Sequence, residues 1–286
     1  MAIGCPECGA LEEIPPLGKR MVARCDVCRI SLERTAGRSV GAAFACALST
    51  FLLLIPANFE PLLSVSAMGA ERTSRLGSGV AFIWGQGWVI VAILLGLFGL
   101  VLPLVRFGGL SLVLGLTLRR ASPTWLGRLY RWVMQMDIWA MPDVFLVGFF
   151  VGYSRVHQHL SARLGAGGYC FIAAALLSML TRATLDRRTV WRSIAPERPI
   201  LPGRPVLSCT ACDLIAPIEA EGSACARCGL RLRARKPDAV KRAIGFSLAA
   251  LVLYAPANIY PMTITTQLGQ ETPRRIIDGV KDIIKA

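Results

Sequence analysis

The sequence reads Cys25-Asp26-Val27-Cys28 and, after an apolar run, Pro56-Ala57-Asn58-Phe59-Glu60-Pro61. The same order occurs again later, as Cys225-Ala226-Arg227-Cys228 followed by Pro256-Ala257-Asn258-Ile259-Tyr260-Pro261. The offset of 200 residues (225 − 25) holds from Cys25 onward without a gap. Repetition at a fixed spacing predicts copies of one structural unit. Each copy joins a cysteine cluster to an apolar segment, so the sequence predicts a tandem repeat. The second copy stops at Ala286, and most of its membrane part is missing.

The composition is typical of a membrane protein. Hydrophobic residues make up 54% of the 286 residues, charged residues make up 17%, and the mean hydropathy is +0.52. Apolar runs of about 18 or more residues with almost no charge predict transmembrane helices. We therefore expect a polytopic α-helical membrane protein that carries two small cytoplasmic zinc-ribbon domains, each built from β-hairpins with four cysteines. The N-terminal segment holds a cysteine cluster, which does not resemble a signal peptide.

Eight of the ten cysteines form Cys-x-x-Cys pairs, two pairs in each copy. Four thiolates at this spacing predict a tetrahedral zinc site, and iron in a rubredoxin-like site or a pair of disulfides are the alternatives. Gly9 and Gly229 directly follow a second cysteine and supply the backbone angles that such turns favour. The predicted metal ligands are Cys5, Cys8, Cys25 and Cys28 at the first site, and Cys209, Cys212, Cys225 and Cys228 at the second.

The apolar pattern divides the chain into five parts. These are a first zinc ribbon (1–36), a first transmembrane module (40–183), a basic linker (184–208), a second ribbon (209–235) and the start of a second module (243–286). The expected spans of the first module are 40–63, 86–118, 138–156 and 166–183, and the second module has one span (243–263) and a tail.

The segments between these spans also carry expectations. Residues 64–83 and 157–165 are polar enough to predict loops, and Pro103 predicts a kink in the long helix over 86–118. The segment 119–137 places its apolar residues at helical spacing among arginines, so we expect it to lie along the membrane surface.

The distribution of Lys and Arg predicts the orientation. Six precede the first span, four lie in 119–137 and thirteen in 182–242, whereas the other side of the membrane would carry four in the first copy and four in the tail. The positive-inside rule then places the N-terminus and both ribbons in the cytoplasm of a bacterium, and the C-terminal tail in the periplasm. Reduced cytoplasmic thiols favour metal over disulfides. The net charge of +14 follows from this bias, so no nucleic acid is expected as a partner.

The Pro-Ala-Asn-x-x-Pro element at the outer end of a span has two interpretations. Two prolines five residues apart interrupt a helix, and Pro56, Asn58 and Pro61 with the equivalent Asn258 would either end the helix at the interface or line a substrate path. Glu60 is replaced by Tyr260, so its charge is not shared between the copies.

Charged residues inside spans need partners or water. Arg106 lies within the long predicted helix and is the natural partner of Asp143, at the start of the third span. Asp137 is favoured as an N-cap, and for Asp143 a cap and a functional group both remain open. The sequence contains neither a P-loop nor a Gly-x-Ser-x-Gly or His-Glu-x-x-His motif, so it predicts a protein that is not an enzyme.

Two tetracysteine clusters, each followed by a membrane module with Pro-Ala-Asn-x-x-Pro, resemble the paraquat-inducible protein A family. The segment Trp139-Ala140-Met141-Pro142-Asp143-Val144-Phe145 is similar to the third-span signature of that family. The resemblance implies an inner-membrane protein that works with a periplasmic MCE-domain partner to move membrane lipids between the two membranes of a Gram-negative envelope. It also implies that the eight paired cysteines bind the metal, and that Asp143 and the Pro56–Pro61 element lie near the membrane path.

The expected function is therefore that of a membrane component of a lipid transport system. Full members of the family carry two complete modules of about four spans each, so either this chain is a fragment or a separate polypeptide completes the second module. The alternative is a membrane-anchored metal or redox stress sensor, in which the ribbons are the active part.

Overall fold

The computed structural model describes residues 2–5, 8, 11–14, 18, 21–34, 39–67, 70–159, 161–196, 206–233, 238–261, 263–267 and 270–274. The chain forms two compact units, Met1–Arg233 and Ala234–Ala286. Within the described residues, five helical segments are long and apolar enough to cross a membrane. They are Val40–Phe59, Val89–Leu118, Leu126–Gln158, Ala166–Thr184 and Ala239–Ile259. Four of these segments end within four residues of the expected spans, and the third begins at Leu126, twelve residues before the expected start at 138.

Two of these segments are composite. Val89–Leu118 consists of helix α3 (Val89–Gly96), a π-helical turn (Leu97–Val101) and helix α4 (Leu102–Leu118). Pro103 is the second residue of α4, so the π-helical turn interrupts the regular α-helix just before it, and the kink at Pro103 stays a prediction. The other composite segment contains α5 (Leu126–Gln135), a 3-10 turn (Met136–Ile138) and α6 (Pro142–His159).

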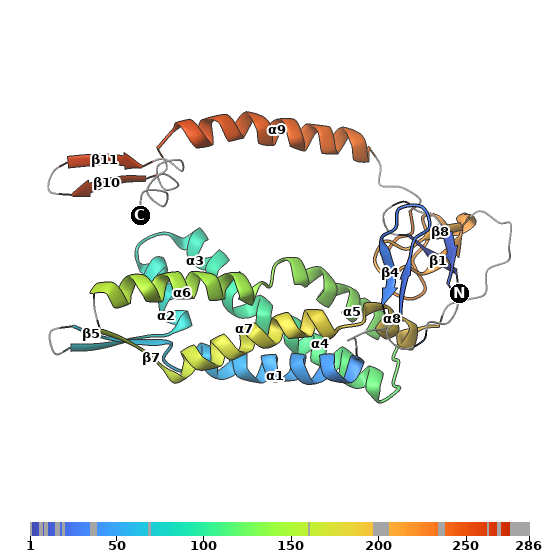
Figure 1. The fold of residues 1–286 in the computed structure, drawn as a ribbon, viewed down its shortest axis with the longest axis horizontal. Coiled ribbons are helices and arrows are strands. Elements are labelled where there is room, and N and C mark those ends of the chain that lie inside the picture. Colours follow the sequence, from blue (N-terminus) through green and yellow to red (C-terminus); the bar gives the residue numbers. More distant parts are fainter. Residues whose placement is uncertain are drawn as a thin grey trace. The chain divides into compact units, whose positions relative to one another are not determined.

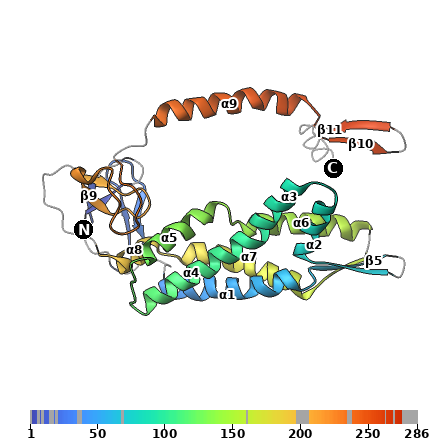
Figure 2. The same ribbon diagram turned by 180° about the vertical axis from the view of Figure 1, so that it is seen from behind.

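The core of the first unit is formed by α1 (Val40–Phe59) against α4 and α7 (Ala166–Thr184), as Figures 1 and 2 show. Ala43 and Ala47 on α1 are fully buried, which lets neighbouring helices approach closely. On α4, Gly108 and Gly115 lie against the rings of Phe51 and Phe44, where an added Cβ would approach to 3.0 and 3.2 Å. Small residues on one helix therefore accommodate large rings on the next.

A three-stranded antiparallel sheet lies at one end of this bundle (Figure 1). Its order is β6–β5–β7, with β5 at Leu63–Ala67, β6 at Ala70–Ser74 and β7 at Ser161–Leu164. Leu63 pairs with both Ser74 and Leu164. The expectation of loops over 64–83 and 157–165 is wrong, because 64–83 contains a hairpin and helix α2 (Leu76–Gly85), and 157–165 contains the end of α6 and β7.

The second unit repeats the element order that opens the first membrane module. Helix α9 (Ala239–Ile259) is followed by β10 (Thr263–Gln267) and β11 (Gln270–Arg274). In this hairpin Thr263 pairs with Arg274, as Leu63 pairs with Ser74 in β5 and β6. The described part of the tail is thus a hairpin, and residues 275–286 lie outside the described residues. The apolar side chains of α9 are exposed within the chain, as expected for a helix that contacts lipid or further helices.

Candidate metal centres and a buried charge cluster

The first cysteine cluster is carried by two short hairpins. Strands β1 (Ala2–Gly4) and β2 (Leu11–Glu13) pair, as do β3 (Val22–Arg24) and β4 (Ser31–Arg34). The Sγ atoms of Cys5 and Cys28 are 3.4 Å apart, and those of Cys8 and Cys25 are 3.6 Å apart. Cys5 and Cys25 are buried, whereas Cys8 and Cys28 are exposed.

The second cluster has the same connectivity and is fully buried. Cys209 faces Cys228 and Cys212 faces Cys225, each with 3.6 Å between the Sγ atoms. Strands β8 (Val206–Ser208) and β9 (Ile215–Pro217) flank the first of its two cysteine turns. Hydrogen bonding among the four thiols lowers the pKa of Cys209 and Cys225 and raises the pKa of Cys212 and Cys228.

Both clusters fit a tetrahedral metal ion. The four Sγ atoms of each cluster lie within 4.8 Å of one another, so either group could hold a metal. Zn–S bonds of about 2.3 Å give a tetrahedron with edges of about 3.8 Å. The observed separations of 3.4–3.6 Å are close to this edge, and all eight paired cysteines are free thiols.

The three Cys-x-x-Cys turns that the structure describes in full share one backbone pattern. The amide of the first cysteine donates to a carbonyl five residues later, and the residue after the second cysteine donates back to the first cysteine. That residue has a positive φ in each case: 58° at Arg29, 55° at Asp213 and 70° at Gly229. Gly229 confirms the sequence prediction, whereas Gly9 lies outside the described residues. Arg29 and Asp213 carry no glycine signal, so sequence reasoning missed these two positions.

The second cluster packs on the membrane module. Its four cysteines share one buried apolar cluster with Leu126, Tyr130 and Val133 of α5, and with Val190 and Trp191 of α8 (Arg187–Ile194). The helix α5 is amphipathic as predicted, with Trp125, Arg128 and Trp132 exposed. Its apolar face, however, packs on protein, so burial in the chain accounts for the pattern from which a membrane-surface position was predicted.

A cluster of opposite charges joins the 3-10 turn at Met136–Ile138 and the start of α6 to α4, α7 and α8. Asp137 pairs with Arg106, with Arg182 at 3.2 Å and with Arg187 at 3.0 Å. Arg182 also pairs with Asp143 at 3.1 Å. The carbonyl of Ala140 accepts from Arg106 Nη1 at 3.1 Å and from Arg182 Nη2 at 3.2 Å. Two carboxylates are thereby shared among three arginines from α4, α7 and α8.

This cluster corrects two expectations. The partner of Asp143 is Arg182 and not Arg106, because Arg106 reaches Asp137 in the 3-10 turn before α6. Asp137 is not an N-cap of α6, since that helix begins at Pro142 and the Asp137 carboxylate is taken up by arginines. The partner Arg182, on α7, was missed because it had been counted only as a residue flanking a span.

The Pro-Ala-Asn elements end their helices in the same way. Helix α1 continues through Pro56 to Phe59, and the Asn58 amide donates to the Leu54 carbonyl at 2.6 Å. In the second unit Asn258 donates to Tyr254 at 2.8 Å, and α9 contains Pro256. The carbonyl of Pro61 accepts from the Gly167 amide at the start of α7, at 3.0 Å. Each asparagine amide thus donates to the carbonyl four residues earlier, two residues before the proline of its element.

Five long apolar helices and two clusters of four thiols define a multi-pass membrane protein with two potential metal centres. The family model described as Paraquat-inducible protein A matches residues 40–195 and 240–286. The chain belongs to this family.

Curated relatives extend the similarity over nearly the whole chain. Lipophilic envelope-spanning tunnel protein A of Escherichia coli K12 is 26% identical over 285 residues, which cover 98% of this chain and 65% of the relative. Intermembrane transport protein PqiA of the same organism is 26% identical over 286 residues, covering 96% of this chain and 67% of the relative. A probable intermembrane transport protein of Haemophilus influenzae is 24% identical over 176 residues, covering 61% and 42%. The chain thus spans about two thirds of the E. coli relatives. No solved structure matches it.

Proposed function

We propose that this protein is an inner-membrane component of an MCE-type intermembrane lipid transport system. The observation that carries the proposal is the similarity over nearly the whole chain to proteins named for intermembrane transport and for an envelope-spanning tunnel. Five apolar helices are consistent with a component that takes lipid from a bilayer. Its partner would be a periplasmic MCE-domain protein, and its cargo would be membrane lipid. The protein would act by passage of cargo and not by catalysis.

The two cysteine clusters would be structural zinc ribbons on the cytoplasmic side. Sulfur separations close to a zinc tetrahedron support zinc, and the Lys and Arg distribution supports the orientation. When bound, zinc would cross-link the four thiolates of each cluster and so hold short hairpins that have little core of their own. The matching order of helix and hairpin in the two units supports a tandem duplication. The remaining spans of the second module would be supplied by further chain or by a separate polypeptide.

The membrane path would pass near the Pro-Ala-Asn elements and the charge cluster. Asn58 Oδ1 and Asp143 Oδ1 are buried and have no hydrogen-bond partner in the described residues, so both could accept a hydrogen bond from a polar headgroup. Pro56, Pro61, Arg106 and Asn258 complete the proposed path residues. We expect Asp143→Asn to change the pH dependence of transport. An unchanged rate and pH profile in a reconstituted assay would remove Asp143 from the mechanism.

The function is tested by native purification of the chain with mass spectrometry of the lipids and proteins that co-purify. Enrichment of phospholipid together with an MCE-domain protein supports the proposal. A fluorescent-lipid transfer assay between vesicles then tests the activity of the unmodified chain and of Asp143→Asn. Gly152→Ala is the matched control, since a Cβ at Gly152 meets nothing within 4 Å. A pure protein that carries neither lipid nor an MCE partner would contradict the proposal.

A membrane-anchored metal or redox sensor is the second candidate. Cys8 and Cys28 of the first cluster are exposed, and exposed thiolates exchange metal and react with oxidants more readily. Rapid loss of metal from the first cluster under mild oxidant, at a concentration that leaves the second loaded, would favour this function. Tight retention at both clusters favours the structural role.

A further inference from the structure

The two cysteine clusters are embedded differently in the protein. The second shares its buried apolar cluster with α5 and α8 of the membrane module. Among the described residues, the buried cluster around the first consists of residues of that cluster's own segment, namely Cys5, Ile14, Cys25 and Leu32. A change of shape at the second cluster therefore reaches the membrane module directly.

The contact with α5 depends on a glycine. A Cβ at Gly127 would overlap the carbonyl oxygen of Arg227 and would lie 3.6 Å from the Cα of Cys228. One residue further along each of the two segments, a Cβ at Gly229 would lie 3.3 Å from Nε of Arg128. The backbone of α5 thus rests directly on the turn between Cys225 and Cys228, and no other residue type fits at position 127 without separating them.

The contact with α8 depends on an arginine inside the same turn. Arg227 is 5% exposed, and its Nη1 donates to the Cys212 carbonyl at 3.2 Å. Its Nη2 donates at 2.6 Å to the carbonyl of Ala195, the residue that ends α8. One side chain therefore connects both cysteine turns of the second cluster to the C-terminal end of α8. Its position is set by the turn that a metal ion would close.

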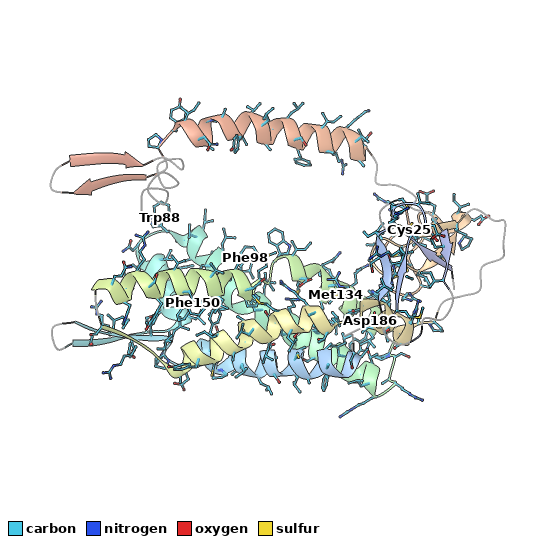
Figure 3. All side chains as sticks on the ribbon, viewed as in Figure 1. Cys25, Trp88, Phe98, Met134, Phe150 and Asp186 are labelled. Carbon is cyan, nitrogen blue, oxygen red and sulfur yellow. The ribbon has the colours of Figure 1, made fainter. Side chains whose placement is uncertain are left out.

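Helix α8 continues the connection to the charge cluster. Asp186, labelled in Figure 3, caps α8 by accepting from Arg188 N at 3.2 Å and Thr189 N at 3.3 Å. From the first turn of α8, Arg187 pairs with Asp137. The ring of Trp191 packs on that of Tyr130 of α5 at an interplanar angle of 60°, with ring centroids 4.6 Å apart. The same short helix thus contacts the second cysteine cluster at one end and the charged residues of the membrane module at the other.

We propose that the face formed by α5 and α8 is a docking surface for the second cysteine cluster in its metal-bound form. Occupancy of the second centre, and not of the first, then sets the packing of α5 and α8 and the order of the Arg187–Asp137 pair. Small cysteine modules fold when the metal binds, so loss of metal removes the folded turn that Gly127 and Ala195 contact. The inference rests on the proposed metal binding and is independent of lipid transport.

The test is hydrogen–deuterium exchange on the full chain in nanodiscs, purified with zinc. We compare Cys225→Ser, which removes a ligand from the second centre, with Cys25→Ser, which removes the equivalent ligand from the first. Native mass spectrometry reports the zinc content of each variant. We expect Cys225→Ser to accelerate amide exchange in α5 and α8 roughly tenfold, and Cys25→Ser to leave it unchanged. Equal exchange in α5 and α8 for the two variants would overturn the proposal.

A second variant covers the case in which Cys225→Ser fails to fold. Gly127→Ala keeps all eight cysteines, and alanine is the better helix former, so an isolated α5 would become more ordered. If docking matters, Gly127→Ala retains two zinc ions while α5 and α8 exchange faster, and the control Gly152→Ala behaves like the unmodified chain. Unchanged protection of α8 in Gly127→Ala would refute the docking surface. Because zinc and exchange are read without lipid cargo, a failure here is distinguishable from failure of the transport proposal.

Discussion

Replacing Asp137 by Asn tests whether the charge cluster holds the membrane module together. Asp137 is the carboxylate that Arg106, Arg182 and Arg187 share. The Arg187 side chain is 59% exposed and that of Arg182 is 31% exposed. Water therefore compensates for much of the ion-pair energy that these two arginines lose with Asp137. The Arg106 side chain is 2% exposed, and it would keep the Ala140 carbonyl, the ring of Phe107 at 4.7 Å and a neutral amide oxygen at position 137, but it would lose its countercharge.

The expected loss of stability is therefore the cost of leaving one buried guanidinium without a countercharge. Removing one partner of a buried ion pair costs about 3–5 kcal/mol. For a chain of this size that lowers the midpoint of thermal unfolding by roughly 10 °C. Asp143→Asn is the matched comparison, because Asp143 has one arginine partner that is partly exposed, and we expect it to cost about 1 kcal/mol or less.

Thermal unfolding of the purified protein in nanodiscs measures both variants. The double variant Arg106→Met/Asp137→Asn removes the buried charge as well as its partner, so it should recover most of the lost stability. Equal midpoints for Asp137→Asn and Asp143→Asn would refute the reasoning. So would a double variant less stable than Asp137→Asn alone.

Three further predictions follow from single contacts. Native mass spectrometry should find two zinc ions in the unmodified chain and one zinc ion after Cys225→Ser. Cys46 lies outside both clusters, so Cys46→Ser is the control and should keep two ions. Two ions after Cys225→Ser would contradict the ligand assignment. Gly165→Ala, whose Cβ would overlap the Pro61 carbonyl, should cost about 1–3 kcal/mol in unfolding free energy, whereas Gly148→Ala should be silent because a Cβ there meets nothing within 4 Å. Trp191→Ala should cost about 3–5 kcal/mol because the ring is buried against Tyr130, and the 55% exposed Trp132 gives a control that should lose far less on the same substitution.

The sequence carries strong local signals for the apolar segments and the cysteine clusters. Long uncharged runs predict spans without knowledge of their neighbours, and the spacing within each Cys-x-x-Cys pair is enough to identify a turn around one ion. The helix ends were harder to predict, because α1 continues through Pro56 to Phe59, although Pro56 has no N–H to donate within the helix.

The contacts between distant segments could not be predicted from one sequence. Strand β7 pairs with β5 about a hundred residues earlier, and nothing local in Ser161–Leu164 indicates a strand in this sheet. The alternation Leu63-Ser64-Val65-Ser66-Ala67 was a local signal for β5 that polar content obscured. Likewise, Asp143 needs a cation, but only the packing of α6 on α7 selects Arg182 over Arg106.

The π-helical turn at Leu97–Val101 contains the Phe98 labelled in Figure 3. This turn sets the directions in which the side chains of α4 project from the helix axis. Each residue of an α-helix advances the side chains by about 100°, so a turn that holds one residue more rotates α4 by that amount relative to α3. Arg106 lies five residues beyond this turn and owes its aim at Asp137 to that offset. Deleting a single residue from the turn would give a more regular helix, and it would turn the Arg106 guanidinium away from Asp137, toward the direction that the 49% exposed Val105 now takes.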